Sequence, residues 1–572
     1  MIKFDYSPRR IKLIIVFIIL FSGILLARLY YIQIVQHDYF TERADHQYVS
    51  KDLTIFNRGS IYFENKDGSV FGAAGVRSGF GVAIVPKEIK DSGDAAKKIY
   101  AVYPLLNIED FTAKAGKPND TYEEIARHLD EVTGQKIGSL KIPGVRVFRE
   151  KWRYYPGNAM ASHVVGFVGY KNDVLLGQYG LENYYESVLG RTDANVYSNF
   201  FAEMFSSFRD VVNKDKQFQG DIVATIEPNV QNFLEKEIKQ ISEDYKSRGA
   251  GGIIMNPQNG EIYAMAATPS FDPNTYSKEK TMGVFVNPMV ESNYEMGSII
   301  KPLTMAAGID AGTVTPETTY FDTGSVTLNK STFYNYDKKG RGKVNMQTVL
   351  SSSLNTGVAF VVKEMGKDLF AKYMLNYGLG EETGIDLPNE TRGFVGNLQS
   401  PREIEYATAS FGQGISMSPI ETVRALASLG NGGLLVNPHI VKRIDYKIGI
   451  PRTISYGEMK RVLKPSTSET ITKMLVNVVD NALLEGKVKM DHYSIAAKTG
   501  TAQVPIIGGN GYYSDRYNHT FFGYFPAYSP KYIVFLYVLE PKGVEYASHS
   551  LTYPFIDITK FLINYYNVPP DR

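Results

Sequence analysis

Three short motifs occur in one order along this 572-residue chain, and together they limit its fold more than any other feature. They are S-x-x-K at residues 298–301, S-x-N at residues 353–355 and K-T-G at residues 498–500. S-x-x-K alone is weak, because short patterns recur by chance in a chain of this length, whereas K-T-G is rarer and K-T-G and S-x-N each occur once. A second S-x-x-K does occur, at residues 277–280, and we interpret it as a solvated turn. All three motifs in this order are a strong joint signal for one site.

The residue types in these motifs suit nucleophilic acyl transfer. On a helix, positions i and i+3 share a face, so the amine of Lys301 reaches the hydroxyl of Ser298. A serine without a neighbouring histidine needs another base, and a desolvated lysine beside a second cation, here Lys498, loses its proton near neutral pH. We expect Ser298 at the start of its helix, after Gly297, where the positive end of the helix dipole favours it. Pro302 is tolerated in a first turn and agrees with this placement.

The remaining motif residues are predicted to support this nucleophile. Ser353 relays a proton to a leaving amine, and Asn355 hydrogen-bonds the substrate backbone and Lys301. The backbone N–H groups of Ser298 and Thr501 form an oxyanion hole. A strand edge that aligns the substrate and holds its carboxylate is expected at Lys498, Thr499, Gly500 and Thr501.

The composition excludes several other classes of protein. A hydrophobic fraction of 44% is ordinary for a globular chain, and the formal charge of 62 − 60 = +2 leaves no basic surplus for nucleic acid. The chain has no cysteine, which excludes disulfides, a thiolate nucleophile and cysteine-ligated metals. Neither HExxH nor GxxxxGK[ST] occurs. We therefore predict no metal and no cofactor.

An apolar segment near the N-terminus predicts a membrane anchor. Residues 13–27 carry no charge, and the apolar character resumes after Arg28, whose long side chain can snorkel and extend the span to residue 35. Four basic residues precede the segment, so residues 1–12 are expected in the cytoplasm and the body of the chain outside. A cleaved signal peptide and a buried core helix are the alternatives.

Two domains are expected after this anchor. Residues 36–215 are mixed and turn-rich, with strands at 60–62 and 80–85 and a helix at 121–132. Their glycine-containing patches, Arg58-Gly59 and Gly180-Leu181-Glu182 among them, are interpreted as turns and packing sites. A charged linker at 213–219 leads to the second domain, residues 218–572.

The second domain is predicted to be α/β or α+β, with a sheet that pairs segments from both of its ends. Strands are expected at 251–255, 261–266 and 532–538. Helices are expected at 230–245, 300–310, 346–365, 419–429 and 554–566.

With these motifs the chain resembles the class B penicillin-binding proteins, the serine D,D-transpeptidases of peptidoglycan synthesis. Further landmarks of that family are Arg58-Gly59, Gly180-Leu181-Glu182, residues 271–274, Gly412-Gln413-Gly414 and residues 498–503. Residues 294–298, 522–527 and 530–532 are most similar to the division-specific type, FtsI. The sequence departs from the family at Met296, where proline is usual, at Ile299, where threonine is common, and at His519-Thr520, where Ala-Ser is more usual.

The resemblance implies a β-lactamase-like transpeptidase fold behind a β-rich pedestal domain of the dimerisation type. It also implies that Ser298 attacks the D-Ala-D-Ala carbonyl of a stem peptide, expels the terminal D-Ala and passes the acyl group to the amine of a second stem peptide. β-Lactams would acylate the same serine. The implied partners are nascent peptidoglycan, a SEDS-type glycosyltransferase and other division proteins at the plasma (inner) membrane.

Other functions are weighed against this one. A serine β-lactamase or carboxypeptidase uses the same three motifs, but a class A lactamase needs a glutamate for deacylation, and Glu390 lies in a stretch interpreted as a turn. Elongation- or sporulation-type transpeptidases share the family pattern. A non-catalytic division scaffold is the alternative from a different class.

Overall fold

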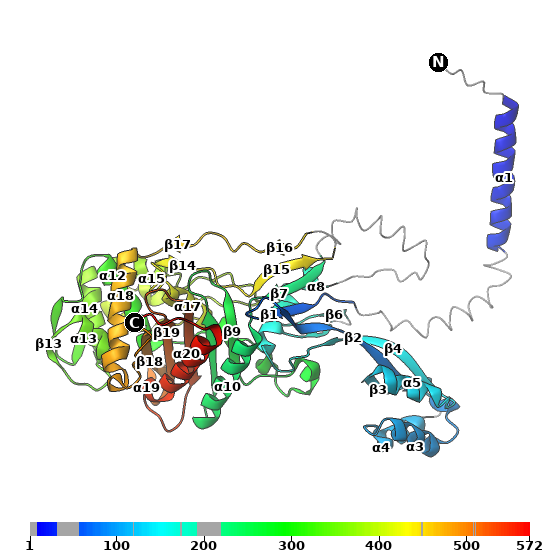
Figure 1. Ribbon diagram of the computed structural model, residues 1–572, viewed down its shortest axis with the longest axis horizontal. Helices are drawn as coiled ribbons and strands as arrows, with labels where there is room; N and C mark the ends of the chain where they lie inside the picture. The colour runs from blue at the N-terminus through cyan, green and yellow to red at the C-terminus, as the bar shows by residue number, and fades with distance from the viewer. Residues whose placement is uncertain are drawn as a thin grey trace. The chain divides into compact units, whose positions relative to one another are not determined.

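The computed structural model describes residues 8–30, 57–117, 119–171, 174–190, 219–447, 450–506, 508–509 and 511–572 (Figure 1). Its contacts divide the chain into two units. One unit contains Ser78–Trp152 together with the N-terminal part up to Phe56, and the other contains Asn57–Arg77 and Arg153–Arg572. These packing units differ from the predicted domain limits. The predicted linker at 213–219 lies outside the described residues, apart from Gln219.

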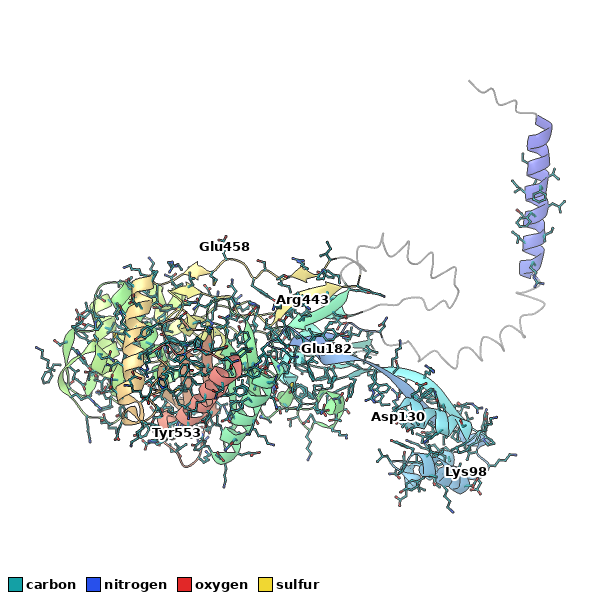
Figure 2. The ribbon with its side chains drawn as sticks, in the orientation of Figure 1. Lys98, Asp130, Glu182, Arg443, Glu458 and Tyr553 are labelled. Carbon is teal, nitrogen blue, oxygen red and sulfur yellow. The ribbon has the colours of Figure 1, made fainter. Side chains whose placement is uncertain are left out.

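The N-terminal segment forms one helix, α1 (Pro8–Tyr30). Side chains are described for residues 15–25 and for Arg28, and all of these are exposed. They project from the helix on all sides (Figure 2). Among the residues described, no helix satisfies the length and apolarity required to cross a membrane.

The unit containing Ser78–Trp152 has a small core of its own, which includes Val82, Ile99, Phe111 and Ile137. Its elements are the end of β2 (Val70–Ile84), α3 (Ser92–Val102), α4 (Ile108–Ala115), β3 (Glu123–Leu129), α5 (Glu131–Ser139) and β4 (Val145–Tyr154). The helix predicted at 121–132 is therefore wrong. Residues 123–129 form a strand because they pair with β2, and Asp130 then caps a new helix by accepting the N–H of Thr133.

In the larger unit, strands from both predicted domains share one sheet. Strand β1 (Ile61–Glu64) lies between β2 and β7 (Gly220–Ala224), and β7 continues to β15 (Val441–Tyr446) and β16 (Arg452–Thr453). The β1–β7 pair is parallel, with Ile61 opposite Ile222. The apolar side chains of these strands enter the main core, so this sheet attaches the segment after residue 57 to the second domain.

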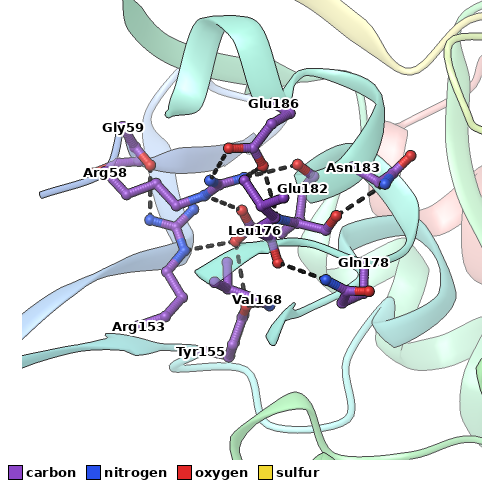
Figure 3. Close-up of polar contacts among 12 residues, drawn as sticks. Arg58, Gly59, Arg153, Tyr155, Val168, Leu176, Gln178, Glu182, Asn183 and Glu186 are labelled. Carbon is purple, nitrogen blue, oxygen red and sulfur yellow. Dashed lines mark hydrogen bonds and ion pairs between the residues drawn. The ribbon is translucent and has the colours of Figure 1, made fainter. Parts of the chain in front are cut away.

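A buried ion-pair network holds the two glycine-containing patches together beside this sheet (Figure 3). Arg58 donates to Glu182, at 2.6 Å, and to Glu186 at the start of α8 (Glu186–Leu189). Arg153 donates to the other oxygen of Glu182, also at 2.6 Å, and to the carbonyl of Gly59. Glu182 lies on α7 (Gly180–Tyr184) and is fully buried. Both patches therefore take part in packing, as predicted.

A five-stranded antiparallel sheet forms the centre of the larger unit. Across the sheet the strands are β18 (Ala496–Pro505), β19 (Tyr512–Phe525), β20 (Tyr532–Leu539), β8 (Gly249–Met255) and β9 (Ile262–Thr268). Strand β20 is buried along its whole length, and β8 beside it comes from almost 300 residues earlier in the chain. The predicted pairing of segments from both ends of the domain is confirmed.

Helices cover both faces of this sheet (Figure 1). On one face α10 (Pro228–Asp244) and α20 (Thr552–Tyr566) share a core with the strands and meet through the stacked rings of Phe233 and Phe561, 4.2 Å apart. The main core packs against the other face. Its helices include α12 (Lys301–Asp310), α13 (Met346–Ser351), α14 (Asn355–Met365), α15 (Lys367–Asn376), α17 (Pro419–Ala427) and α18 (Pro465–Asn477).

Two small antiparallel pairs lie between α12 and α13 in the chain. One joins β10 (Thr319–Asp322) to β13 (Gly342–Asn345), and the other joins β11 (Ser325–Leu328) to β12 (Ser331–Tyr334). The predicted strands and helices of the second domain are thus present, although the helix expected at 346–365 is divided into α13 and α14.

Candidate active site

A tight turn presents the predicted nucleophile. Residues Gly297–Ile300 form a 3₁₀ turn that leads directly into α12, and Pro302 occupies the first turn of that helix. In a 3₁₀ turn positions i and i+3 are nearly eclipsed, so Ser298 and Lys301 share one face. Gly297 has φ +62°, a conformation that a residue with a side chain adopts only at a cost. The glycine before Ser298 is therefore required by the backbone.

This turn rests on the K-T-G strand. A Cβ added to Gly500 would lie 2.7 Å from the carbonyl oxygen of Met296 and 2.3 Å from the hydroxyl of Thr520. The Thr520 hydroxyl itself donates to that Met296 carbonyl at 2.8 Å. This hydrogen bond joins two residues that depart from the family pattern, Met296 and Thr520. Because Gly500 has no side chain, it leaves the space for their contact.

The S-x-N motif breaks the helix that was expected to run through it. Helix α13 ends at Ser351 and α14 begins at Asn355, because Ser353 adopts φ +52°. This left-handed conformation is costly for a non-glycine residue and is often found at functional sites. It directs both the carbonyl and the hydroxyl of Ser353 toward Lys301.

Two buried lysines converge on the hydroxyl of Ser353. Lys301 Nζ donates to Ser353 Oγ at 3.1 Å and to its carbonyl oxygen at 2.5 Å. Lys498 Nζ donates to the same Oγ at 3.0 Å and to the carbonyl of Thr499 at 3.0 Å. The exposed fractions of the two lysines are only 0% and 3%. The structure thus brings together residues from all three motifs.

Burial changes the protonation of both lysines. Desolvation, followed by the charge of Lys498, lowers the pKa of Lys301 well below its ordinary value. Desolvation also lowers the pKa of Lys498, to about 7. The sequence analysis named desolvation and a second cation as the two causes, and for Lys301 desolvation is the larger of them. One of the two amines is therefore available as a base near neutral pH.

Other predicted site residues lie close by. Lys498, Thr499, Gly500 and Thr501 belong to β18, which is the edge strand of the central sheet. The hydroxyl of Thr501 accepts the N–H of Ala547 at 3.1 Å. Asn355 was expected to bond Lys301, but its amide donates to the carbonyl of Tyr334 at 2.7 Å. The bonds of the Lys301 amine run to Ser353 rather than to Ser298.

Glu295, three residues before Ser298, was not predicted as a site residue, although it lies in the stretch that resembles the division-specific type. Its carboxylate accepts the N–H of Gly414 and the hydroxyl of Tyr512, each at 3.1 Å. Its other oxygen is buried without a partner in the described structure, and burial raises the pKa of this group to about 7. Glu295 joins the serine turn, the loop after Gly412 and the start of β19.

The alternatives weighed on sequence fall at other places in the fold. Glu390 accepts the N–H groups of Thr383 and Gly384 and the Thr383 hydroxyl, so its carboxylate closes a turn, as predicted. Ser277 and Lys280 of the second S-x-x-K are exposed, in agreement with a solvated turn.

A buried lysine pair around a serine hydroxyl, set against the edge strand of this sheet, is typical of serine acyltransferases that bind penicillin. Residues 250–559 match the penicillin binding protein transpeptidase domain, and residues 56–200 match the penicillin-binding protein dimerisation domain. The first match alone covers more than half of the chain. The chain therefore belongs to the penicillin-binding protein transpeptidase family, and the resemblance found in its sequence is confirmed.

Named relatives span almost the whole chain. Stage V sporulation protein D of Bacillus subtilis is 29% identical over 96% of this chain and 84% of its own length. A probable peptidoglycan D,D-transpeptidase, PenA of Neisseria meningitidis, is 26% identical over 96% of this chain and 93% of its own. A crystal structure of mycobacterial penicillin binding protein 3 with aztreonam is 25% identical, with a TM-score of 0.65 over 74% of this chain and 92% of that one. Penicillin binding protein 2X of Streptococcus thermophilus shares the fold, with a TM-score of 0.72 at 20% identity over 90% and 81% of the two chains.

Proposed function

We propose that the protein is a peptidoglycan D,D-transpeptidase that joins stem peptides through an acyl-enzyme on Ser298. The observation that carries this proposal is the single hydroxyl of Ser353 shared by Lys301 and Lys498. Such an arrangement moves a proton between the nucleophile and the leaving group without histidine, metal or cofactor. Relatives named as peptidoglycan D,D-transpeptidases support the choice of substrate.

In the first step, Ser298 Oγ attacks the carbonyl between the two D-Ala residues of the donor stem peptide. The proton of its hydroxyl passes to the neutral amine of Lys301, whose pKa burial has lowered. The backbone N–H groups of Ser298 and Thr501 stabilise the oxyanion. The proton then travels through Ser353 to the nitrogen of the terminal D-Ala, which leaves as the C–N bond breaks.

Lys498 and its neighbours hold the donor. Lys498, while protonated, pairs with the terminal carboxylate of the peptide, and Thr499 and Thr501 align the peptide along the edge strand β18. The amide of Asn355, at the start of α14, is placed to bond the peptide backbone.

In the second step an amine of another stem peptide attacks the acyl-enzyme, loses its proton to the base and releases Ser298. β-Lactams acylate Ser298 in place of the donor.

A lactamase is less well supported. The glutamate that the sequence offered for deacylation, Glu390, is fully engaged in closing its own turn. An acyl-enzyme on Ser298 is then expected to persist rather than to hydrolyse quickly.

The cellular role that we propose is septal wall synthesis during division. FtsI of Buchnera aphidicola and an FtsI homolog of Mesostigma viride support this role. Their matches with this chain extend over 97% and 96% of their respective lengths. Sporulation is the second candidate, because Stage V sporulation protein D is 29% identical to this chain. Growth of a conditional mutant distinguishes the two: filaments indicate division, whereas normal growth with defective spores indicates sporulation.

The same proposal places the protein at the plasma (inner) membrane, anchored once by residues 13–35, with its catalytic domain outside. The exposed apolar side chains of α1, among them Phe17 and Ile19, support an anchor. A SEDS-type glycosyltransferase and other division proteins are the expected partners, as the family resemblance implies.

A fluorescent penicillin tests the catalytic proposal. The full-length protein in detergent is incubated with the label beside a Ser298→Ala variant. Stable labelling of the unchanged protein alone is expected. Labelling that disappears within minutes would favour a lactamase, and equal labelling of both proteins would refute the role of Ser298. No labelling of either protein would favour a scaffold.

A further inference from the structure

A buried carboxylate that the proposed mechanism does not use lies close to the S-x-N motif. Asp322, the last residue of β10, is only 1% exposed. Its carboxylate accepts the backbone N–H groups of Gly324 and Arg341, each at 3.0 Å, whereas the guanidinium of Arg341 pairs with Asp337. A buried charge is costly unless hydrogen bonds satisfy it, so the fold must supply further donors to this group.

The further donors come from two side chains that also hold the start of α14. Asn335 donates to both carboxylate oxygens of Asp322, at 3.0 and 3.1 Å, and the hydroxyl of Thr356 donates to one of them at 2.7 Å. Asn335 and Thr356 are themselves only 1% and 2% exposed. These three side chains form one buried set, which we call the Asp322 cluster.

The Asp322 cluster supplies a cap that α14 lacks at its own end. The first N–H groups of a helix have no partner inside the helix, and Leu354, the residue before α14, has no polar side-chain atom to accept one. Asn335, 21 residues before Thr356, accepts the N–H of Thr356 at 3.2 Å. The neighbouring carbonyl of Tyr334 accepts the amide of Asn355 at 2.7 Å. Two consecutive residues of α14 are thus tied to the end of β12.

The turn that leads into α14 carries the hydroxyl shared by the two buried lysines. Ser353, in this turn, has φ +52°, a costly conformation that persists only where the surrounding structure holds it. From the α13 side the N–H groups of Ser353 and Leu354 bond the carbonyls of Leu350 and Val349, at 3.3 and 2.9 Å. From the α14 side the Asp322 cluster holds Thr356. Loss of this second hold would let Ser353 relax and carry its hydroxyl away from the lysines.

We propose that Asp322 is a positioning residue for proton transfer in the active site. It acts through Asn335 and Thr356 on the backbone of Ser353, and it keeps the Ser353 hydroxyl between the two lysines. This inference rests on the proposed transpeptidase function, in which that hydroxyl carries the proton to the leaving nitrogen, and it adds a group outside the three motifs. A broken cluster should slow the chemical step, while β18 continues to bind the substrate.

The kinetics of labelling with a fluorescent penicillin test this inference in the full-length protein in detergent. A series of penicillin concentrations separates the dissociation constant of the first complex from the rate constant of acylation. Thr356→Val keeps the shape of the side chain and removes its hydroxyl. The rate constant should fall roughly tenfold, while the dissociation constant changes by less than about twofold. Thr356→Ser keeps the hydroxyl and should keep the rate.

Thr559→Val is the matched control. Thr559 is also fully buried, and its hydroxyl bonds the carbonyl of Phe555 within α20, on the other face of the central sheet. Both threonine-to-valine exchanges remove one buried hydroxyl, so thermal unfolding should show losses of similar size. Only Thr356→Val should slow acylation.

A second background tests whether the effect passes through Ser353. Ser353→Ala removes the relay hydroxyl, and its slow residual labelling is followed over hours. In this background Thr356→Val should slow acylation by less than about twofold, because no hydroxyl remains to be misplaced. Asp322→Asn weakens the same cluster without a change in α14, and it should match Thr356→Val in both backgrounds. Circular dichroism verifies the fold, and if one of these two variants does not fold the other decides.

Each other result has a defined meaning. An unchanged rate in Thr356→Val, an equal loss in Thr559→Val, slow labelling that a weaker first complex explains, or a tenfold loss that persists in the Ser353→Ala background would each overturn the positioning role. All of these leave the transpeptidase proposal intact. Failure of the penicillin to label Ser298 in the unchanged protein would instead refute the proposed function on which the inference rests.

Discussion

At the scale of single residues, the two buried lysines predict how acylation depends on pH. The reaction needs neutral Lys301, so its rate rises with pH through the lowered pKa of that amine. It also needs protonated Lys498 to hold the carboxylate, and the pKa of that group is about 7, so the rate falls above about pH 7. We expect a bell-shaped profile for the second-order rate constant of penicillin acylation, measured between about pH 5 and 9.

Two variants assign the falling limb of that profile. Lys498→Arg keeps its charge at every pH in this range and should remove the fall, at some cost in rate. Burial also raises the pKa of Glu295 to about 7, and Glu295→Gln should leave the fall in place because the proposed mechanism gives this carboxyl no contact with the substrate. A profile that stays flat between about pH 6 and 8 in the unchanged protein would contradict the assignment.

The sequence could predict that Lys301, Ser353 and Lys498 converge, because the three motifs are recognised by residue type and order. It did not predict the bond from Lys301 to the carbonyl of Ser353, which depends on the left-handed backbone of Ser353. The contact between the rings of Tyr336 and Tyr546 was also not predicted, since 40 tyrosines offer no local signal that distinguishes two of them. This contact depends on the fold, which joins segments 210 residues apart.

At the scale of elements, the contact between the serine turn and β18 predicts the effect of one methyl group. In Gly500→Ala the new Cβ would lie 2.3 Å from Thr520 Oγ1 and 2.7 Å from the Met296 carbonyl, so the turn must move away from the strand. A misplacement of about 1 Å at a catalytic group costs on the order of 10²-fold in rate. We expect acylation to slow by about that factor while the protein remains folded by circular dichroism.

Gly283→Ala is the matched control, because an added Cβ there meets nothing within 4 Å. Its acylation rate should equal that of the unchanged protein. An unchanged rate in Gly500→Ala as well would show that the turn and the strand are not held in the contact described.

The buried ion-pair network predicts a large loss of stability. Glu182→Ala leaves Arg58 and Arg153, which are 3% and 9% exposed, without their shared carboxylate. Removing one partner of a buried pair costs about 3–5 kcal/mol of unfolding free energy. Chemical denaturation of the full chain, followed by tryptophan and tyrosine fluorescence, should show the corresponding lower midpoint.

The exposed pair of Glu88 and Arg146 supplies the comparison, since these side chains are 40% and 53% exposed. Glu88→Ala should change the unfolding free energy by less than about 1 kcal/mol. Equal effects of Glu88→Ala and Glu182→Ala would mean that burial of the Arg58 network contributes nothing to stability.

Elements were predictable where one periodicity ran long enough. Helices α10 and α20 and strands β8 and β20 agree with their predicted ranges to within three residues. The predicted helix at 121–132 failed because strand pairing with β2 outweighed a helical spacing of only three apolar residues. The helix at 346–365 was divided because a local backbone conformation at Ser353 interrupts an otherwise continuous apolar pattern.

At the scale of the whole molecule, the sequence indicated a sheet that pairs distant segments but not how the packing divides the chain. Strand β1 precedes residues 78–152 in sequence, yet its partner β7 follows them. The composition does not reveal this insertion, because the chain leaves the larger unit within strand β2 and returns to it within strand β4. The predicted limit between the domains near residue 216 rested on the charged linker and on the change of sequence pattern that follows it.

The anchor yields the last prediction. Side chains 15–25 of α1 are exposed, with 70% of the surface of Phe17 and 66% of that of Ile19 uncovered, and an aqueous solvent would disfavour so much apolar surface on one helix. If lipid covers it, the full chain should sediment with membranes and resist high salt and alkaline carbonate, and a variant that lacks residues 1–36 should be released while still labelling with penicillin. A double exchange, Ile19→Lys with Leu20→Lys, places two charges at the centre of the segment at a cost of about 2.5–3.5 kcal/mol each. It should release the protein as the deletion does, whereas Ile19→Leu with Leu20→Ile should leave it bound. Extraction of the unchanged chain by salt alone would show that the helix lies on a surface or against a protein partner instead of spanning the bilayer.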